Sequence, residues 1–267
     1  MDNRPIGVFD SGLGGLTVVK ELMKELQNES IVYFGDTARI PYGTRSKETV
    51  TRFSAQCIRF LLSKDIKMVV IACNTASASS FDDLTAQFKL PIIGVIRPGA
   101  GAAVEATRNG RVGVIGTSAT IRSKAYPIAI KEINPDIQVF DEACSLFVPI
   151  VEEGWSDTEI GRMVAERYLQ NIKNQNVDTL VMGCTHYPLL EKTFAAIMGP
   201  EVKLINPAVN TVRQVRRMLE DNNMMNDSSK PASVSFYVSD IGQNFQAIGS
   251  KFLHQEVMAE SINIENY

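Results

Sequence analysis

The stretch "LVMGCTHYPL" (residues 180–189) ends an apolar run with a cysteine, a threonine and a histidine. It can be aligned with "VVIACNTASA" (69–78), so that Cys184 and Cys73 fall at the same position. In both stretches the apolar run is a predicted strand, and polar residues follow the cysteine at once. This similarity indicates two related halves, each with a cysteine where a strand ends.

Short runs rich in β-branched residues alternate with segments of helical period along nearly the whole chain. We predict strands over residues 6–10, 31–36, 68–73, 92–96, 111–116, 137–141, 179–184, 202–206 and 234–240. They are continuously apolar, which is typical of parallel strands buried on both faces. Helices such as 16–26 and 47–63 carry one apolar stripe each. This alternation predicts βαβ units with right-handed crossovers.

A second pair of segments supports the internal repeat, because "IGVFDSGLGGL" (6–16) can be aligned with "VGVIGTSATI" (112–121). We therefore predict an α/β fold with two pseudo-symmetric, doubly wound domains. Their sheets should be mainly parallel, with an active site in the cleft between the domains. We expect the first domain to comprise residues 1–97 plus 207–267, and the second to comprise 98–206.

Composition narrows the classes of partner. The chain has 267 residues, of which 45% are hydrophobic, and a formal net charge of -3. Because no long basic run stands out, we expect neither nucleic acid nor an anionic membrane as a partner. "MDNRPIGVFD" (1–10) does not resemble a signal peptide. The apolar runs are far shorter than the roughly 20 residues that cross a bilayer. We expect a soluble, cytoplasmic protein.

The cysteines are widely spaced and form no C-x-x-C pair. A disulfide framework or a structural zinc site is therefore disfavoured, and His254 lies in an amphipathic stretch far from all of them. Cys57 falls on the buried stripe of its helix, and we predict that it and Cys144 pack in the core. Cys73 and Cys184 differ because helices are expected to begin just beyond them, and a helix N-terminus lowers the pKa of a thiol.

Polar clusters lie where the predicted strands end, which is where ligands bind in open α/β sheets. They are "DSGLGG" (10–15), "GDTARIPYG" (35–43), "CNTAS" (73–77) and "CTHYP" (184–188). Their hydroxyls, amides and helix N-termini suit a small carboxylate. The glycine cluster lacks the third glycine of a dinucleotide fingerprint, so we favour a tight turn that lets the backbone approach a small ligand.

Two facing thiols could place an amino acid α-carbon between them. One thiolate would remove the α-proton from one face while the other thiol delivers a proton to the opposite face, which inverts the stereocentre. A free thiol is mostly protonated at neutral pH, so each needs a helper. His186 could serve Cys184, and Asp10 could serve Cys73. The alternatives are that His186 only bonds backbone near a helix start and that Asp10 is an N-cap.

Six motifs together resemble a known family. They are "DSGLGGLTV", "GDTARIPYG", "ACNTASA", "GTSATIRS", "VPIVEEG" and "GCTHYPLL". In this order they are similar to the blocks of the cofactor-independent glutamate racemases of bacterial cell-wall synthesis. The resemblance covers most of the chain. It implies interconversion of L- and D-glutamate between two α/β domains, without metal, pyridoxal phosphate or nucleotide, and a homodimeric protein.

The resemblance also assigns roles to residues. Cys73 matches the cysteine that acts on D-glutamate, and Cys184 matches the one that acts on L-glutamate. Asp10 and His186 match the acidic and basic helpers, while Asp36 and Glu152 match carboxylates with supporting catalytic roles. The implied substrate-binding residues are Asp10, Ser11, Tyr42, Gly43, Asn74, Thr75, Thr117, Thr120, Thr185 and His186.

The chain departs from the family pattern at two places. Ser145 and Phe147 stand where proline and an aliphatic residue are common, and Asn206 and Pro207 stand where an Asp-Ser pair is usual. These departures leave the local shape near Glu152 and the hinge near residue 207 open.

Three alternative functions remain at this point. The nearest is a racemase for aspartate or another amino acid, because pocket shape decides side-chain length. From other classes, the chain could be a non-catalytic protein that binds small carboxylates, or a dithiol redox protein. A redox protein would require a disulfide between Cys73 and Cys184, with the two sulfurs about 2 Å apart.

Overall fold

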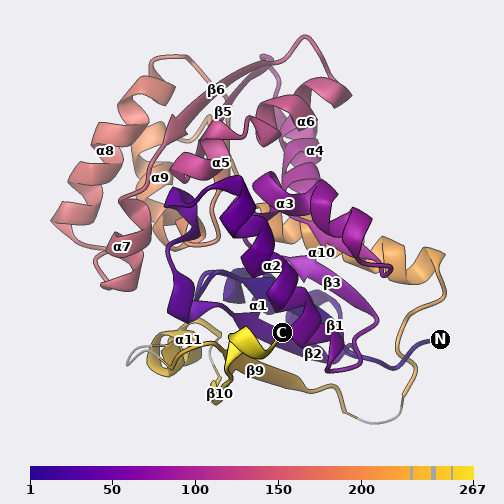
Figure 1. Cartoon of the computed structure of the whole chain (residues 1–267). Coiled ribbons are helices and arrows are strands. Elements are labelled where there is room, and N and C mark those ends of the chain that lie inside the picture. The colour runs from indigo at the N-terminus through magenta and orange to yellow at the C-terminus, as the bar shows by residue number, and fades with distance from the viewer. Residues whose placement is uncertain (229–230, 242–244, 254) are drawn as a thin grey trace.

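The strands form two sheets (Figure 1), in a computed structural model that describes residues 1–228, 231–241, 245–253 and 255–267. The first sheet has the order β10-β9-β2-β1-β3-β4. Its strands are β1 (Ile6–Asp10), β2 (Ile31–Gly35), β3 (Met68–Ile71), β4 (Ile92–Gly94), β9 (Val234–Val238) and β10 (Ala259–Ser261). The second sheet has the order β6-β5-β7-β8. Its strands are β5 (Arg111–Gly116), β6 (Gln138–Ala143), β7 (Thr179–Gly183) and β8 (Lys203–Ile205).

The two sheets repeat one topology. The order β2-β1-β3-β4 in the first sheet matches the order β6-β5-β7-β8 in the second, and every strand pair is parallel. β1 therefore corresponds to β5 and β3 corresponds to β7, as the alignment of the cysteine motifs requires. The predicted pair of mainly parallel, pseudo-symmetric α/β sheets is confirmed. Below, the first half and the second half denote the parts of the chain built around these sheets.

Helices cover both faces of each sheet. The α-helices are α1 (Leu16–Glu25), α2 (Lys47–Leu62), α3 (Asn74–Gln87), α4 (Ile96–Ala106), α5 (Ser118–Arg122), α6 (Ala125–Ile133), α7 (Phe147–Glu152), α8 (Glu159–Lys173), α9 (Glu191–Met198), α10 (Pro207–Asp221) and α11 (Phe245–Leu253). The 3₁₀ turns are η1 (Thr37–Arg39), η2 (Tyr42–Thr44), η3 (Tyr187–Leu190) and η4 (Ile264–Asn266).

Successive side chains of one strand enter different cores, because they point to opposite faces of the sheet. Val8 of β1 packs with Val19 of α1, whereas its neighbour Phe9 packs with Phe60 of α2. In the second sheet, α4 and α6 cover one face, and α7, α8 and α9 cover the other (Figure 1). Both sheets are thus doubly wound, as predicted.

The chain returns to the first half at its C-terminal end. After α10 packs against α1 and α4, β9 pairs with β2 in the first sheet. The placement of the boundaries at 97/98 and 206/207 stays a prediction. Within the described part of the chain, no helix is both long and apolar enough to cross a membrane.

The strand ends differ from the prediction at the two cysteines. β3 stops at Ile71, and Cys73 is the N-cap of α3. β7 stops at Gly183, and Cys184 precedes the 3₁₀ turn η3 rather than an α-helix. A helix thus begins just beyond each cysteine, as predicted, but beside Cys184 its first turn is the 3₁₀ turn η3, which leads directly into α9. β10 was not predicted, since three residues of mixed polarity give no strand pattern.

Candidate active site

The loops that follow β1, β3, β5 and β7 bring the two halves into contact. The Thr185 hydroxyl donates to Asp10 Oδ1 at 3.4 Å, which links the loop after β7 to the end of β1. Thr75 at the start of α3 and Thr117 after β5 lie with their hydroxyl oxygens 2.9 Å apart. All four side chains are buried. The carboxyl ends of both sheets therefore meet in one polar region, where the sequence placed the active site.

Cys73 is a buried thiol held by the start of α3. Its sulfur accepts the backbone N–H of Ala76 at 3.4 Å and lies 3.6 Å from the hydroxyl oxygen of Ser11. Burial and the nearby Asp10 carboxylate raise the pKa of Cys73 to about 12, more than the Ala76 N–H and Ser11 lower it. Cys73 is thus a protonated thiol at neutral pH, in contrast to the lowered pKa expected from its helix N-terminus.

Cys184 has a different partner. Its sulfur lies 3.8 Å from His186 Nδ1, and His186 Nε2 lies 3.2 Å from Glu152 Oε1 at the end of α7. Burial lowers the pKa of His186, but the contacts with Cys184 and Glu152 outweigh burial and raise it to about 10. His186 is therefore a buried imidazolium at neutral pH. A row of sulfur, imidazolium and carboxylate leads from Cys184 to the half-buried Glu152.

The raised pKa of His186 has a consequence for stability. In the unfolded chain histidine titrates near 6.5, so the stabilisation by His186 is full below that pH and is lost as the pH rises through about 10. We expect the unfolding free energy of the wild type to exceed that of His186→Asn by an amount that shrinks between pH 6.5 and 10. The slope should be at most about 1.4 kcal/mol per pH unit. Urea unfolding at pH 7, 8 and 9 measures it, and a difference that does not depend on pH would contradict the assignment.

Asp10 is fully buried between the two cysteine loops. Its carboxylate accepts the backbone N–H of Gly12 at 3.0 Å and the Thr185 hydroxyl. Burial raises the pKa of Asp10, although the positive charge of His186 and these hydrogen bonds oppose the rise. Asp10 could therefore take up a proton, but its charge raises the pKa of Cys73 and does not promote the thiolate. Its assignment as the helper of Cys73 stays a prediction.

Three threonine hydroxyls form a buried cluster across the two halves. Thr117 and Thr120 lie 3.1 Å apart, and both contact Thr75. The backbone of Gly43 lies against Thr117, since a Cβ added at Gly43 would come within 2.8 Å of Thr117 Cβ. These hydroxyls are hydrogen-bond donors next to the thiol loops, which suits the predicted recognition of a carboxylate.

Asp36 and Tyr42 form a hydrogen-bonded network in the first half. The Tyr42 hydroxyl donates to Asp36, and it lies 3.9 Å from the Cys57 sulfur. Asp36 also accepts hydrogen bonds from Arg39 at 2.8 Å and from Ser239 at 2.9 Å. The hydrogen bonds of Asp36 and Tyr42 thus join them to each other, to Arg39 and to Ser239, while Tyr42 also shares a buried apolar cluster with Cys73. Their assigned catalytic and substrate-binding roles stay predictions.

Two residues at the site were missed from the sequence. A Cβ added at Gly14 would lie 2.2 Å from Thr185 Oγ1 and 2.6 Å from His186 Nδ1, so this glycine lets the turn after β1 approach the other half. The run of three glycines in 10–15 was the available signal. Tyr126 donates to Asn74 Oδ1 at 2.7 Å. No local pattern marks a tyrosine in α6 as part of a site in another half.

The departures from the family pattern have local structural roles. Ser145 lies 3.0 Å from Ser118 through the hydroxyl oxygens, and Phe147 packs edge-on against Tyr187. Asn206 caps α10 by accepting the Ala208 N–H at 3.1 Å. As predicted, Cys57 and Cys144 are fully buried in apolar clusters, and all four cysteines are free thiols. His254 lies outside the described residues.

Known proteins are similar to this chain over nearly its whole length. A glutamate racemase of Geobacter metallireducens is 50% identical over 250 residues, which cover 94% of this chain and 93% of that protein. A glutamate racemase of Streptococcus pneumoniae is 44% identical over 266 residues, covering 99% and 100%. The crystal structure of glutamate racemase from Francisella tularensis in complex with D-glutamate matches with a TM-score of 0.93. It is 42% identical, and the match covers 100% of both chains.

The sequence model of the Asp/Glu/hydantoin racemase family matches residues 6–215, which include both thiol loops and all of the second sheet. This match and the relatives confirm the resemblance carried by the six sequence motifs. The chain belongs to the Asp/Glu/hydantoin racemase family.

Proposed function

We propose that this protein is a glutamate racemase, an isomerase that interconverts L- and D-glutamate by a two-base mechanism without a cofactor. The observation that carries the proposal is the placement of Cys73 and Cys184. They are buried thiols at corresponding strand ends of two like sheets, in one polar region, and the family assignment agrees with them. Relatives at 44% and 50% identity over nearly the whole chain are glutamate racemases.

The geometry supports a reaction in which one sulfur removes the α-proton and the other sulfur gives a different proton to the opposite face of the α-carbon. Cys184 takes the α-proton of L-glutamate, and its electron pair stays on the α-carbon. Cys73, a thiol in the resting protein because its pKa is about 12, gives its proton to the opposite face and forms D-glutamate. His186 supplies positive charge beside the Cys184 sulfur. The reverse reaction needs Cys73 as a thiolate, which the ammonium group of a bound amino acid would favour.

The hydroxyl cluster and the helix N-terminus would hold the carboxylates. Thr75, Thr117, Thr120 and Asn74 offer donors from both halves, and the N–H groups at the start of α3 add positive potential. Because both halves supply groups that bind the substrate, we expect substrate binding to draw the halves together. Water is then excluded and the proton transfers take place between fixed groups.

Proton NMR in deuterium oxide tests the function directly. L-glutamate and D-glutamate are each incubated with the reduced protein and no added cofactor, and L-aspartate is run in parallel. We expect loss of the α-proton signal and formation of the other enantiomer from either glutamate, with aspartate unchanged. Turnover of aspartate would shift the assignment to its nearest rival. Glutamate binding without exchange would favour a non-catalytic binding protein, and rapid formation of a Cys73–Cys184 disulfide would favour a redox role.

Gly14 provides a steric test of the contact between the halves. Gly14→Ala places a methyl group within 2.6 Å of the His186 ring, so His186 and Thr185 must move. A displacement of about 1 Å at catalytic groups can cost about 100-fold in rate, and we expect a loss of that order in kcat/KM. The matched control is Gly101→Ala in α4, where an added Cβ meets nothing within 4 Å. That variant should keep full activity and gain slightly in stability. Equal activity of the two variants would show that the halves do not meet at Gly14.

The biological setting follows from the same proposal. The enzyme would supply D-glutamate for peptidoglycan synthesis, act in the cytoplasm, and form a homodimer, as the family leads us to expect. Sedimentation velocity with and without D-glutamate measures the oligomeric state. A monomer across micromolar concentrations would contradict the dimer and leave the chemistry untouched.

A further inference from the structure

Tyr126 connects the two cysteine loops, although it belongs to neither. It lies in α6 of the second half and is 1% exposed. Its hydroxyl donates to Asn74 Oδ1 at 2.7 Å, and Asn74 directly follows Cys73. Its ring lies against Gly183, which directly precedes Cys184, because a Cβ added at Gly183 would come within 3.0 Å of Tyr126 Cε2. One side chain thus touches the neighbours of both thiols.

The hydrogen bond favours one orientation of the Asn74 amide, because with the amide flipped the buried Tyr126 O–H would have no acceptor among the hydrogen bonds of the described residues. An asparagine side chain presents an acceptor oxygen at one end and an NH₂ group with two donors at the other. Since Asn74 Oδ1 accepts from Tyr126, the NH₂ group points to the other side, where no hydrogen bond within the described residues uses it. A free pair of donors is what a substrate carboxylate requires. The flipped amide would present an oxygen to that carboxylate, and the two acceptors would repel each other.

Tyr126 remains a donor during the proposed reaction. Burial raises the pKa of its hydroxyl, and negative charge on Cys184 raises it further. The phenol therefore stays protonated when Cys184 becomes a thiolate. The ring cannot easily leave, because Gly183 packs against one edge and the side chain is buried in the core of α4 and α6. A rigid platform of this kind holds a binding group in one orientation.

We propose that Tyr126 is a positioning residue that orients the Asn74 amide to donate to a substrate carboxylate and links that orientation to closure of the two halves. The link arises because donor and acceptor come from different halves, so the hydrogen bond exists only while α6 lies against the start of α3. The proposal rests on the proposed racemase function for its substrate. Its structural part, the orientation of a carboxylate-binding amide, concerns binding alone.

Tyr126→Phe is the direct test, because it removes the hydroxyl and keeps the ring. We expect KM for both glutamate enantiomers to rise about tenfold, as the loss of one oriented hydrogen bond implies, while kcat changes less than twofold. Calorimetric titration with D-glutamate should show the same loss of affinity. The matched control is Thr179→Val, which removes a fully buried hydroxyl that bonds Asp178 at the opposite end of β7. It should lower the melting temperature to a similar extent and leave KM and affinity unchanged.

A double-mutant cycle separates positioning from general loss of packing. In the Asn74→Ala background the amide is gone, so Tyr126→Phe should raise KM no further. The inference is overturned if Tyr126→Phe leaves KM and affinity unchanged, or if its effect multiplies with that of Asn74→Ala. The racemase proposal fails differently, when the wild type binds glutamate but exchanges no α-proton. In that case the affinity of Tyr126→Phe for D-glutamate still decides the role of Tyr126.

Discussion

Cys184→Ala and Cys73→Ala should each reduce kcat for the racemisation of glutamate by about 100- to 10,000-fold. That range is what one positioned acid or base contributes, and each cysteine serves as both in the two directions. The expected loss is equal for both starting enantiomers, because inversion needs a proton to leave one face and another to reach the opposite face. Circular dichroism of glutamate solutions follows the net conversion.

The residual exchange of each variant should reveal which face its remaining thiol serves. With Cys184 removed, Cys73 can only remove and return the α-proton of D-glutamate, so any deuterium uptake should be confined to D-glutamate. With Cys73 removed, uptake should be confined to L-glutamate. Uptake into both enantiomers in one variant would mean that a single base serves both faces, and the two-thiol mechanism would then be wrong.

Cys144→Ala is the matched control for both variants. Cys144 is a fully buried residue of the second half, and its side chain lies in an apolar cluster and donates from the thiol to the carbonyl oxygen of Glu142. Its removal should lower stability, since a buried sulfur is lost, while racemisation stays at the wild-type rate. If Cys144→Ala were inactive, the inactivity of Cys73→Ala and Cys184→Ala could not be attributed to the loss of a catalytic thiol.

The two thiols could be found from the sequence because their signal is local. Each follows an apolar strand pattern, and the repeated motif places Cys73 and Cys184 at corresponding strand ends, where parallel sheets bind ligands. The strands and their mainly parallel arrangement also followed from the alternation of strands and helices, except for the short β10, whereas the order of strands in each sheet was not predicted. Strands, helices and the two cysteine positions were therefore predicted well, because each depends on a local pattern in the sequence.

Partners that come from distant segments were not predictable in this way. The helper assigned to Cys73, Asp10, bonds Thr185 of the other half, and Asp36 accepts a hydrogen bond from Ser239, which is distant in the sequence. Both outcomes depend on which side chain fills the space beside a carboxylate once the chain has folded. Sequence spacing carries no information on that packing. The same reason hid the contact of Tyr126 with Asn74.

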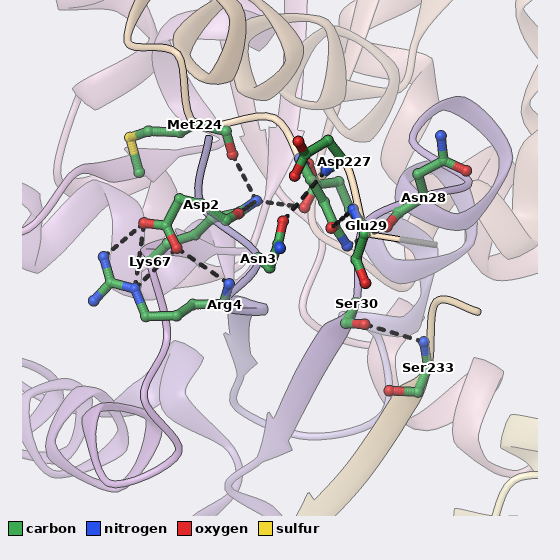
Figure 2. Close-up of polar contacts among 12 residues, drawn as sticks. Asp2, Asn3, Arg4, Asn28, Glu29, Ser30, Lys67, Met224, Asp227 and Ser233 are labelled. Atoms are coloured by element: carbon green, nitrogen blue, oxygen red, sulfur yellow. Dashed lines mark hydrogen bonds and ion pairs between the residues drawn. The ribbon is translucent and has the colours of Figure 1, made fainter. Parts of the chain in front are cut away.

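A buried ion pair at the other end of the first sheet was also not predicted from the sequence, because isolated charged residues beside strands are usually exposed to solvent. Lys67 precedes β3, Glu29 lies two residues before β2, and both side chains are fully buried. The Lys67 ammonium lies 2.5 Å from Glu29 Oε2 and donates to the carbonyl oxygens of Asp2 and Met224 at 2.8 and 2.7 Å (Figure 2). The segment that follows α10 thus supplies a backbone group, the Met224 carbonyl, that completes a buried site.

Lys67→Met should therefore destabilise the protein by about 3–5 kcal/mol, because it leaves the Glu29 carboxylate buried without its counter-charge. The double variant Glu29→Leu/Lys67→Met should recover only part of this loss. The double variant removes both charges, but it also removes the partners of three backbone groups. In the wild type the carbonyl oxygens of Asp2 and Met224 accept from Lys67, and the N–H of Asn226 donates to Glu29 at 2.8 Å. All three would remain buried without partners. Urea unfolding measures the differences.

The matched control for this pair is Lys124→Met, which breaks the pair of Lys124 with Asp141 on the surface. Lys124 is 57% exposed, so its pair with Asp141 should contribute less than about 1 kcal/mol. Lys67 lies at the end of β3 opposite to Cys73, so Lys67→Met should racemise glutamate at the wild-type rate at temperatures where it stays folded. A large loss of activity with unchanged stability would contradict a purely structural role. A stability change no greater than that of Lys124→Met would show that water reaches the pair and solvates Glu29.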